Sequence, residues 1–171
     1  MAVPAIMDGS HLLLCSPTGS GKTMTAFLTV IDKLVRASMS SKLESRVYCV
    51  YISPIKALAN DIQKNLIGPL EEIREKFMNG KNQEIKVGLR TGDTTQSERQ
   101  KMLRKPPHIL ITTPESLAIA IASKRFQPIL EEVEYLILDE LHSLVPTKRG
   151  THLALTISMM DTMPAGGITT L

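Results

Sequence analysis

Short apolar runs alternate along the chain with longer segments in which apolar residues recur at helical spacing. A strand that is apolar on both faces is typical of a parallel sheet covered by helices on each side. The runs predict strands over residues 11–15, 46–52, 85–89, 108–112 and 135–138. The residues between these runs should therefore supply the covering helices.

Apolar spacing of about 3.6 residues predicts those helices. They are expected over residues 23–37, 55–78, 95–105, 114–123 and 150–163. The second of them has the apolar spacing of one helix or two, and Gly68-Pro69 is the expected break. This alternation of strand and helix indicates an α/β fold with a mostly parallel central sheet. A chain of 171 residues has the length of one domain.

Composition and charge restrict the class of protein and its location. The chain is 43% hydrophobic and 22% charged, which is ordinary for a globular protein, and its net charge of +3 permits nucleic-acid binding without requiring it. No stretch reaches the ~18 apolar residues of a membrane span, and the N-terminus lacks a basic signal-peptide start. We therefore expect a cytoplasmic protein with no membrane partner. Cys15 and Cys49 lie in apolar runs and are expected to be buried, reduced thiols.

A phosphate-binding loop is predicted directly after the first expected strand. The segment SPTGSGKT leads into an amphipathic helix, which is the context that a P-loop requires. Small residues let the backbone N–H groups turn toward phosphate oxygens, and the helix N-terminus adds further donors. Lys22 should reach the β- and γ-phosphates, and the Thr23 hydroxyl should ligate Mg²⁺. The expected nucleotide-binding residues are Ser16, Thr18, Gly19, Ser20, Gly21, Lys22 and Thr23.

An acidic pair follows the apolar strand YLIL. In an open parallel sheet, ligands bind at the carboxyl ends of the strands, where the P-loop also lies. Asp139 is therefore placed to hold Mg²⁺ through water, and Glu140 to orient and deprotonate the attacking water. His142 is a candidate for linking this site to the rest of the protein. With Lys22, these three residues are the candidate catalytic residues.

Three more loops, at residues 53–56, 90–93 and 113–116, follow strands at the same predicted edge. The first and third place a hydroxyl residue at a helix N-cap and Pro at the first helical position, and Thr112 with Glu115 fits a capping box. Helix N-termini on one edge can receive the phosphates of a nucleic-acid strand, although plain helix capping is the reading that local chemistry favours. The backbone contacts expected are Lys56, Arg90 and Thr113.

Taken together, these motifs resemble a known family. SPTGSGKT, SPIKALAND, RTGD, TTPESL and DELH resemble the first motor domain of a superfamily 2 DExH-type helicase. The longer strings YISPIKALANDI, RTGDTTQSERQKMLRKPPHILITTPESL and ILDELHSL, followed by KRGTHLAL, resemble the large helicase-related (Lhr) family. The likeness runs from about Gly9 to Leu155.

The resemblance implies a RecA-like P-loop NTPase fold with three α/β/α layers. It implies ATP and Mg²⁺ as cofactors, with Thr23 and Asp139 at the metal. The implied activity is ATP-dependent translocation along single-stranded DNA, with unwinding of duplex or DNA–RNA hybrid, in DNA repair. The residues implied to line the strand are Ser53, Pro54, Lys56, Arg90, Gly92, Thr113, Pro114 and Glu115.

The chain also departs from the family pattern. The sequence contains no upstream glutamine motif, no Ser-Ala-Thr motif after the closing helix, and no second motor domain with its arginine finger. These departures predict one RecA-like domain, residues 1–171, that hydrolyses ATP weakly without its partner domain. Two alternatives stay open: a degenerate binding module without motor activity, or an RNA helicase domain, since backbone contacts alone do not select DNA. The segment KRG at 148–150 resembles a family segment whose contacts the sequence does not assign.

Overall fold

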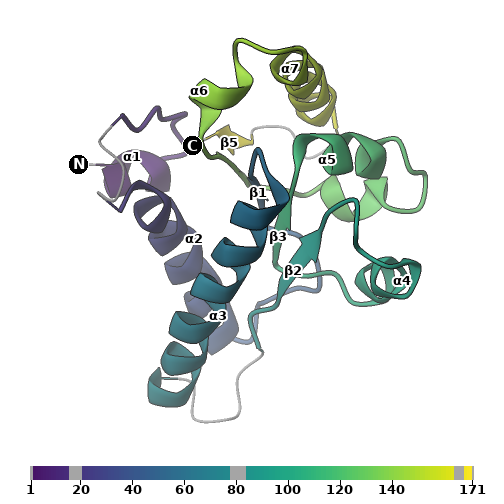
Figure 1. Ribbon diagram of the computed structural model, residues 1–171. Coiled ribbons are helices and arrows are strands. Elements are labelled where there is room, and N and C mark those ends of the chain that lie inside the picture. The colour runs from purple at the N-terminus through teal and green to yellow at the C-terminus, as the bar shows by residue number, and fades with distance from the viewer. Residues whose placement is uncertain (1, 16–20, 78–83, 164–167, 171) are drawn as a thin grey trace.

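Five strands form one parallel sheet in the computed structural model, which describes residues 2–15, 21–77, 84–163 and 168–170 (Figure 1). The sheet order is β2-β3-β1-β4-β5. The strands are β1 (Cys49–Ile52), β2 (Val87–Arg90), β3 (Ile109–Thr112), β4 (Tyr135–Leu138) and β5 (Thr169–Thr170). The register aligns Arg90, Thr112, Ile52 and Leu138, the last residues of four neighbouring strands. The loops after these strands therefore leave from one level.

Helices cover both faces of this sheet, as the alternation predicts (Figure 1). One face carries α1 (Ala2–Met7), α2 (Lys22–Met39) and α3 (Lys56–Phe77). The other carries α4 (Gln96–Arg104), α5 (Pro114–Ile121), the 3₁₀ helix η1 (Gln127–Leu130), α6 (Leu141–Leu144) and α7 (Lys148–Asp161). Among the described residues, no helix combines the length and the apolar character that a membrane crossing needs.

Two hydrophobic cores lie between these layers. Tyr51 of β1 packs with Phe27 and Leu66 on the first face, while Val50 and Ile52 pack on the second. Successive side chains of a strand point to opposite faces, so a strand with four buried residues contributes to both cores. This confirms the expected three-layer α/β architecture.

The expected strand over residues 11–15 is wrong. Those residues form no strand, although the Leu12 N–H donates to the Thr170 carbonyl at 2.9 Å. Leu13 is 74% exposed, and Cys15 is also exposed. The run lies beside β5, whose two residues offer too short an edge for a five-residue ladder. Cys49, in contrast, is buried as expected.

Helix α3 continues through Pro69, so the expected break at Gly68-Pro69 is also wrong. Proline in a helix removes one hydrogen bond and costs about 3 kcal/mol. Leu66 and Leu70 lie on either side of the proline, and both are buried in the first core. Their burial offsets that cost and holds the two halves in line.

The helix starts differ in part from the expected capping. Thr113 is the N-cap of α5 with Pro114 in the first turn, as expected. The capping box expected of Thr112 and Glu115 is absent, because the Thr112 hydroxyl donates to the Arg90 carbonyl at 2.8 Å. Pro54 does not open a helix either, since α3 begins at Lys56. A capping box is present at α4 instead, between Thr95 and Glu98.

Candidate functional site

The carboxylate of Asp139 is the centre of the first site. Its Oδ2 accepts hydrogen bonds from the Thr23 hydroxyl at 3.1 Å and the Tyr51 hydroxyl at 2.5 Å. Its Oδ1 accepts the backbone N–H of Glu140 at 2.9 Å. Donors from α2, β1 and the turn after β4 therefore hold one side chain. The fold brings Thr23 and Asp139 together although 116 positions separate them.

Tyr51 is a member of this site that the sequence reasoning missed. Its side chain is fully buried, and its ring centroid lies 5.2 Å from that of Phe27. Burial, reinforced by the hydrogen bond to Asp139, raises the pKa of Tyr51, so its hydroxyl keeps its proton and donates at neutral pH. The clue in the sequence is a tyrosine hydroxyl near the end of a strand that is otherwise apolar, Cys49–Ile52.

The start of α2 forms one wall of the site. Gly21 has φ +82°, a left-handed conformation that favours glycine, and it caps the helix before Lys22. Of the predicted phosphate-binding residues, Ser16, Thr18, Gly19 and Ser20 lie outside the described residues. A cavity of about 670 Å³ opens here. Its lining includes Lys22, Thr23, Asp139, Glu140 and His142.

Glu140 occupies a strained turn beside Asp139. Its φ of +51° is left-handed, which costs a non-glycine residue about 1–3 kcal/mol. The Ser143 backbone N–H and hydroxyl both donate to the Glu140 carbonyl, at 2.9 and 2.8 Å, and hold the turn. Its carboxylate lies 3.3 Å from Nε2 of His142, whose side chain is 80% exposed. These hydrogen bonds hold the strained turn, which places Glu140 in the cavity wall.

The donor set at this site fits a magnesium ion. Thr23 and Asp139 offer hard oxygen ligands, and Mg²⁺ needs few protein ligands because it keeps most of its waters. Within the described ranges, no group of three or more His, Cys, Asp or Glu side chains converges. The remaining ligands would therefore be waters or the oxygens of a bound phosphate.

The second region comprises the three loops that follow β1, β2 and β3. Lys56 Nζ lies 2.7 Å from Asp93 Oδ1, so the first and second loops meet. The same lysine also lies over Gly92, where a Cβ would be 3.4 Å from its Nζ, an ordinary van der Waals distance. Ser53 is buried, and its N–H donates to the Thr112 carbonyl at 3.0 Å. The predicted strand-binding residues thus gather at one edge of the sheet.

Arg90 lies beneath this edge rather than on it. The side chain is buried, and its guanidinium lies 4.1 Å from the ring centroid of Phe126. Its Nη1 has no hydrogen-bond partner among the described residues. Burial and then the neighbouring Arg99 lower the pKa of Arg90 to about 10, so it is still a cation at neutral pH. Its expected contact with a nucleic-acid backbone stays a prediction.

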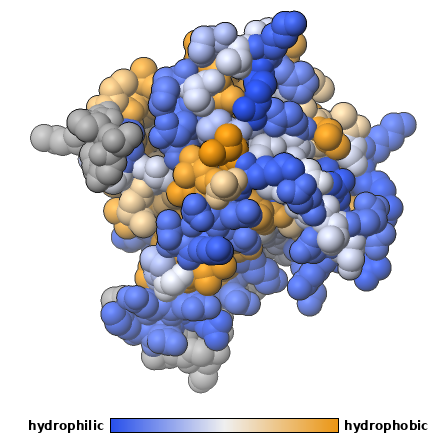
Figure 2. Space-filling view, viewed as in Figure 1, coloured by the Kyte–Doolittle hydropathy of each residue, from blue (hydrophilic) through white to orange (hydrophobic). Residues whose placement is uncertain are grey.

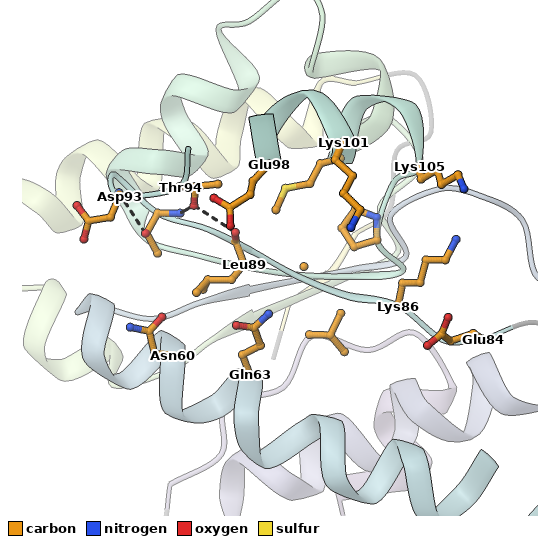
Figure 3. Close-up of a pocket in the computed structure, with 15 residues that line it drawn as sticks. Asn60, Gln63, Glu84, Lys86, Leu89, Asp93, Thr94, Glu98, Lys101 and Lys105 are labelled. Atoms are coloured by element: carbon orange, nitrogen blue, oxygen red, sulfur yellow. Dashed lines mark hydrogen bonds between the residues drawn. The ribbon is translucent and has the colours of Figure 1, made fainter. Parts of the chain in front are cut away.

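The turn after β2 also forms one end of a separate hollow of about 650 Å³ between α3 and α4 (Figure 3). The Thr91 N–H donates to the Thr94 hydroxyl at 2.8 Å, and that hydroxyl donates to the Leu89 carbonyl at 3.2 Å. Asn60 and Gln63 reach toward the hollow from α3 on the opposite side (Figure 3). The internal bonds fix the turn that carries Gly92.

Arg149 is the second residue whose role the sequence did not assign. It lies in the first turn of α7, and its Nε is 2.5 Å from Glu115 Oε1. Its Nη2 donates to the Pro54 carbonyl at 2.6 Å. Arg149 therefore contacts both the loop after β1 and the first turn of α5.

The surface near the loops after β1, β2 and β3 has both apolar and hydrophilic parts. Figure 2 shows an apolar patch near the centre of the view, over the end of β1 and the start of α3, with hydrophilic surface around it. Ile55, in this segment, is 56% exposed. An apolar side chain between polar loops can contact the sugar and base faces of a flexible ligand, while the loops contact its charges.

The sheet, its covering helices and the loops at its carboxyl edge define a RecA-like helicase core. The chain belongs to the DEAD/DEAH box helicase family, whose sequence profile matches residues 1–170.

Within this family, the chain is similar in sequence to Lhr helicases. The chain is 51% identical over 162 residues to the "ATP-dependent helicase Lhr-Core" of Methanocaldococcus jannaschii, covering 94% of this chain and 19% of that protein. It is 46% identical to the "Lhr helicase/uracil glycosylase" of Escherichia coli, covering 90% of this chain and 10% of that protein. The chain therefore spans a fifth or less of the length of these two relatives.

A solved structure agrees with the sequence comparison. The Mycobacterium smegmatis helicase Lhr, bound to ssDNA and AMP-PNP, superposes with a TM-score of 0.86 at 38% identity. The match covers 98% of this chain and 21% of that one. The similarity to Lhr helicases thus holds in both sequence and structure.

Proposed function

We propose that this chain is the ATP-binding motor domain of an Lhr-like ATP-dependent DNA helicase. It would couple ATP hydrolysis to movement along single-stranded DNA and to unwinding of duplex or DNA–RNA hybrid. The observation that carries the proposal is the convergence of Thr23, Asp139 and Glu140 beside Lys22 at the carboxyl edge of the sheet. Residues 1–171 form the single domain, and a second motor domain is its proposed partner.

At the nucleotide site, each side chain has a distinct task. Lys22 and the backbone N–H groups at the start of α2 would bind the phosphates of ATP. Thr23 and Asp139 would hold Mg²⁺, which when bound neutralises charge on the phosphate oxygens. Glu140 would orient the attacking water and accept its proton. His142, which lies beside Glu140, would link the nucleotide site to the rest of the protein.

At the loop edge, the chain would hold the sugar–phosphate backbone of a single strand. Helix N-termini and hydroxyl groups supply donors for phosphate oxygens, while contacts to the backbone carry no base information. The similarity to a helicase solved with ssDNA supports this assignment. The proposed lining residues are Ser53, Pro54, Lys56, Arg90, Gly92, Thr113, Pro114 and Glu115. The cytoplasm, where ATP and nucleic acid are both present, is the proposed location.

The first experiment tests nucleotide binding. Wild type and Lys22→Ala are titrated with Mg²⁺–ADP and Mg²⁺–ATP while the melting temperature is followed, with Lys64→Ala on the exposed face of α3 as a matched control. At a ligand concentration of about 100 Kd, a folded site is stabilised by about 2.7 kcal/mol, which is several degrees in a domain of this size. We expect that rise in wild type and in Lys64→Ala, and its loss in Lys22→Ala.

An equal rise in wild type and Lys22→Ala would contradict the assigned phosphate site. No rise in any variant would favour a degenerate module without motor activity. Competition between DNA and RNA oligonucleotides of matched sequence then decides between a DNA and an RNA helicase domain, because only contacts to the 2′-hydroxyl separate them.

A further inference from the structure

A single arginine joins three segments that lie far apart in the sequence. The Arg149 guanidinium binds both carboxylate oxygens of Glu115, at 2.5 Å from Nε and 3.3 Å from Nη2. The same Nη2 donates to the Pro54 carbonyl at 2.6 Å. Glu115 lies in the first turn of α5, and Pro54 lies in the loop after β1. One planar group therefore spans two loops from a third element.

The two loops that it joins leave the sheet side by side. Strands β1 and β3 are hydrogen-bonded neighbours, and Ile52 lies opposite Thr112. Helix α7 packs on α5, which brings Arg149 over the gap between the two loops. A change in the spacing of these loops would change the spacing of the donors that they present to a nucleic-acid strand.

We propose that Arg149 is a positioning residue for the strand-binding edge, where it fixes the loop after β1 against the first turn of α5. The proposal rests on the proposed function of these two segments. Arg149 acts through Glu115 and Pro54, and its guanidinium is already engaged by a carboxylate and a carbonyl.

Stability alone does not account for this contact. The side chains of Arg149 and Glu115 are 43% and 51% exposed, and an exposed ion pair contributes little to stability. A two-pronged guanidinium–carboxylate contact does impose a fixed plane and spacing. The ion pair lowers the pKa of Glu115 and raises that of Arg149, so both groups stay charged near neutral pH.

The backbone that carries Arg149 is itself tightly held. The Thr147 hydroxyl donates to the Leu144 carbonyl at 2.7 Å at the end of α6. A Cβ on Gly150 would lie 2.4 Å from that same carbonyl oxygen, so only glycine permits this approach. Arg149 therefore acts from an anchored turn rather than from a free loop.

Charge makes the role of Glu115 testable. A carboxylate at an edge that binds phosphates repels them, so the contribution proposed for Glu115 is its contact with Arg149 and not a contact with phosphate. Replacing Glu115 by Gln removes that repulsion, and simple electrostatics predicts tighter binding of a strand. Loss of the two-pronged contact with Arg149 predicts the opposite, because the loops lose their spacing.

The experiment compares dissociation constants for a dye-labelled single-stranded DNA oligonucleotide, measured by fluorescence anisotropy on the 171-residue protein at one salt concentration. We expect Glu115→Gln to weaken binding about threefold to tenfold and Arg149→Lys to weaken it similarly, because one ammonium does not reproduce the fork. The matched control is Glu71→Gln, an exposed glutamate of α3 with the same charge change. It should bind the oligonucleotide as wild type does, or slightly more tightly.

Amide hydrogen exchange on the free protein supplies a second readout. Arg149→Lys should speed exchange at residues 53–56 and 114–117 and leave the amides of β1 and β4 unchanged. Tighter or unchanged binding by Glu115→Gln would overturn the proposal, as would weaker binding without faster exchange at these loops. If wild type itself binds no oligonucleotide while Mg²⁺–ADP still stabilises it, the proposed strand-binding function fails, a result distinct from a failure of the variants alone.

Discussion

The two regions at the carboxyl edge of the sheet are built in opposite ways. At Asp139, neutral hydroxyl and amide donors surround one carboxylate, and the cavity beside it keeps room for a ligand. At the loops after β1, β2 and β3, cations are paired within the protein: Lys56 with Asp93 and Arg149 with Glu115. The first region holds one carboxylate beside an open cavity. The second uses its charges to fix the shape of its loops.

This difference affects what a substitution should do. Removing a donor at the first region should alter ligand affinity with only a moderate effect on folding. Removing a paired charge at the second should alter geometry, so the sign of the charge change does not predict the effect on binding. The predictions below test that contrast, from the largest expected effect to the smallest.

Gly150→Ala should give the largest effect. Gly150 follows Arg149 in the first turn of α7 and packs against the end of α6. The new Cβ would lie 2.4 Å from the Leu144 carbonyl oxygen and 3.1 Å from Val145 Cα, so the start of α7 must shift. Forced shifts of this kind cost about 1–3 kcal/mol. We expect the free energy of unfolding, measured by urea denaturation, to fall by about 2–3 kcal/mol.

Thr151→Ala is the control for this substitution. Thr151 is exposed in the same turn of α7, and alanine favours helix, so stability should change by less than about 0.5 kcal/mol. An equal loss in both variants would show that the turn is sensitive to any change. No loss in Gly150→Ala would contradict the close approach of α6 and α7.

Tyr51→Phe should have a smaller effect that is concentrated on the ligand. The variant keeps the ring that packs on Phe27 and removes only the hydroxyl that donates to Asp139. A hydrogen bond to a charged group contributes about 1.5–3 kcal/mol, part of which water can replace. We expect unfolding free energy to fall by about 1–2 kcal/mol and the affinity for Mg²⁺–ADP, measured by calorimetry, to fall severalfold.

Tyr48→Phe provides the matched comparison. Tyr48 is also buried, and its hydroxyl oxygen accepts the Glu44 N–H at 3.0 Å, at the other end of the sheet. It should lose similar stability and keep full affinity for Mg²⁺–ADP. If both variants lose affinity equally, the Tyr51 hydroxyl has no special role at Asp139.

The sequence predicts the site at Asp139 better than the loops after β1, β2 and β3, and the reason is physical. Four strands and the meeting of Thr23 with Asp139 follow from local patterns, because apolar runs and loop chemistry fix where each strand ends. Thr23 and Asp139 each belong to a local motif, whereas no motif marks the contacts of Tyr51 with Asp139 or of Arg149 with Glu115, so only the packing of whole layers reveals them. The expected strand at residues 11–15 fails for the same reason, since an apolar run needs a neighbouring strand long enough to pair with it.

The smallest effect on stability is expected at Arg90, which is the cation of the second region that lacks an acidic partner among the described residues. A buried charge without a partner contributes little or negatively to stability, so Arg90→Met should leave the unfolding free energy unchanged or raise it by about 1 kcal/mol. Arg99→Met removes the same charge nearby, but Arg99 donates to the carbonyls of Thr91 and Gly92, so this control should lose stability. If Arg90→Met instead destabilises the fold as much as Arg99→Met, Arg90 stabilises the loops as Arg99 does. If it leaves the fold intact and weakens oligonucleotide binding, the Arg90 charge serves the bound strand, and the second region also keeps one charge for its ligand.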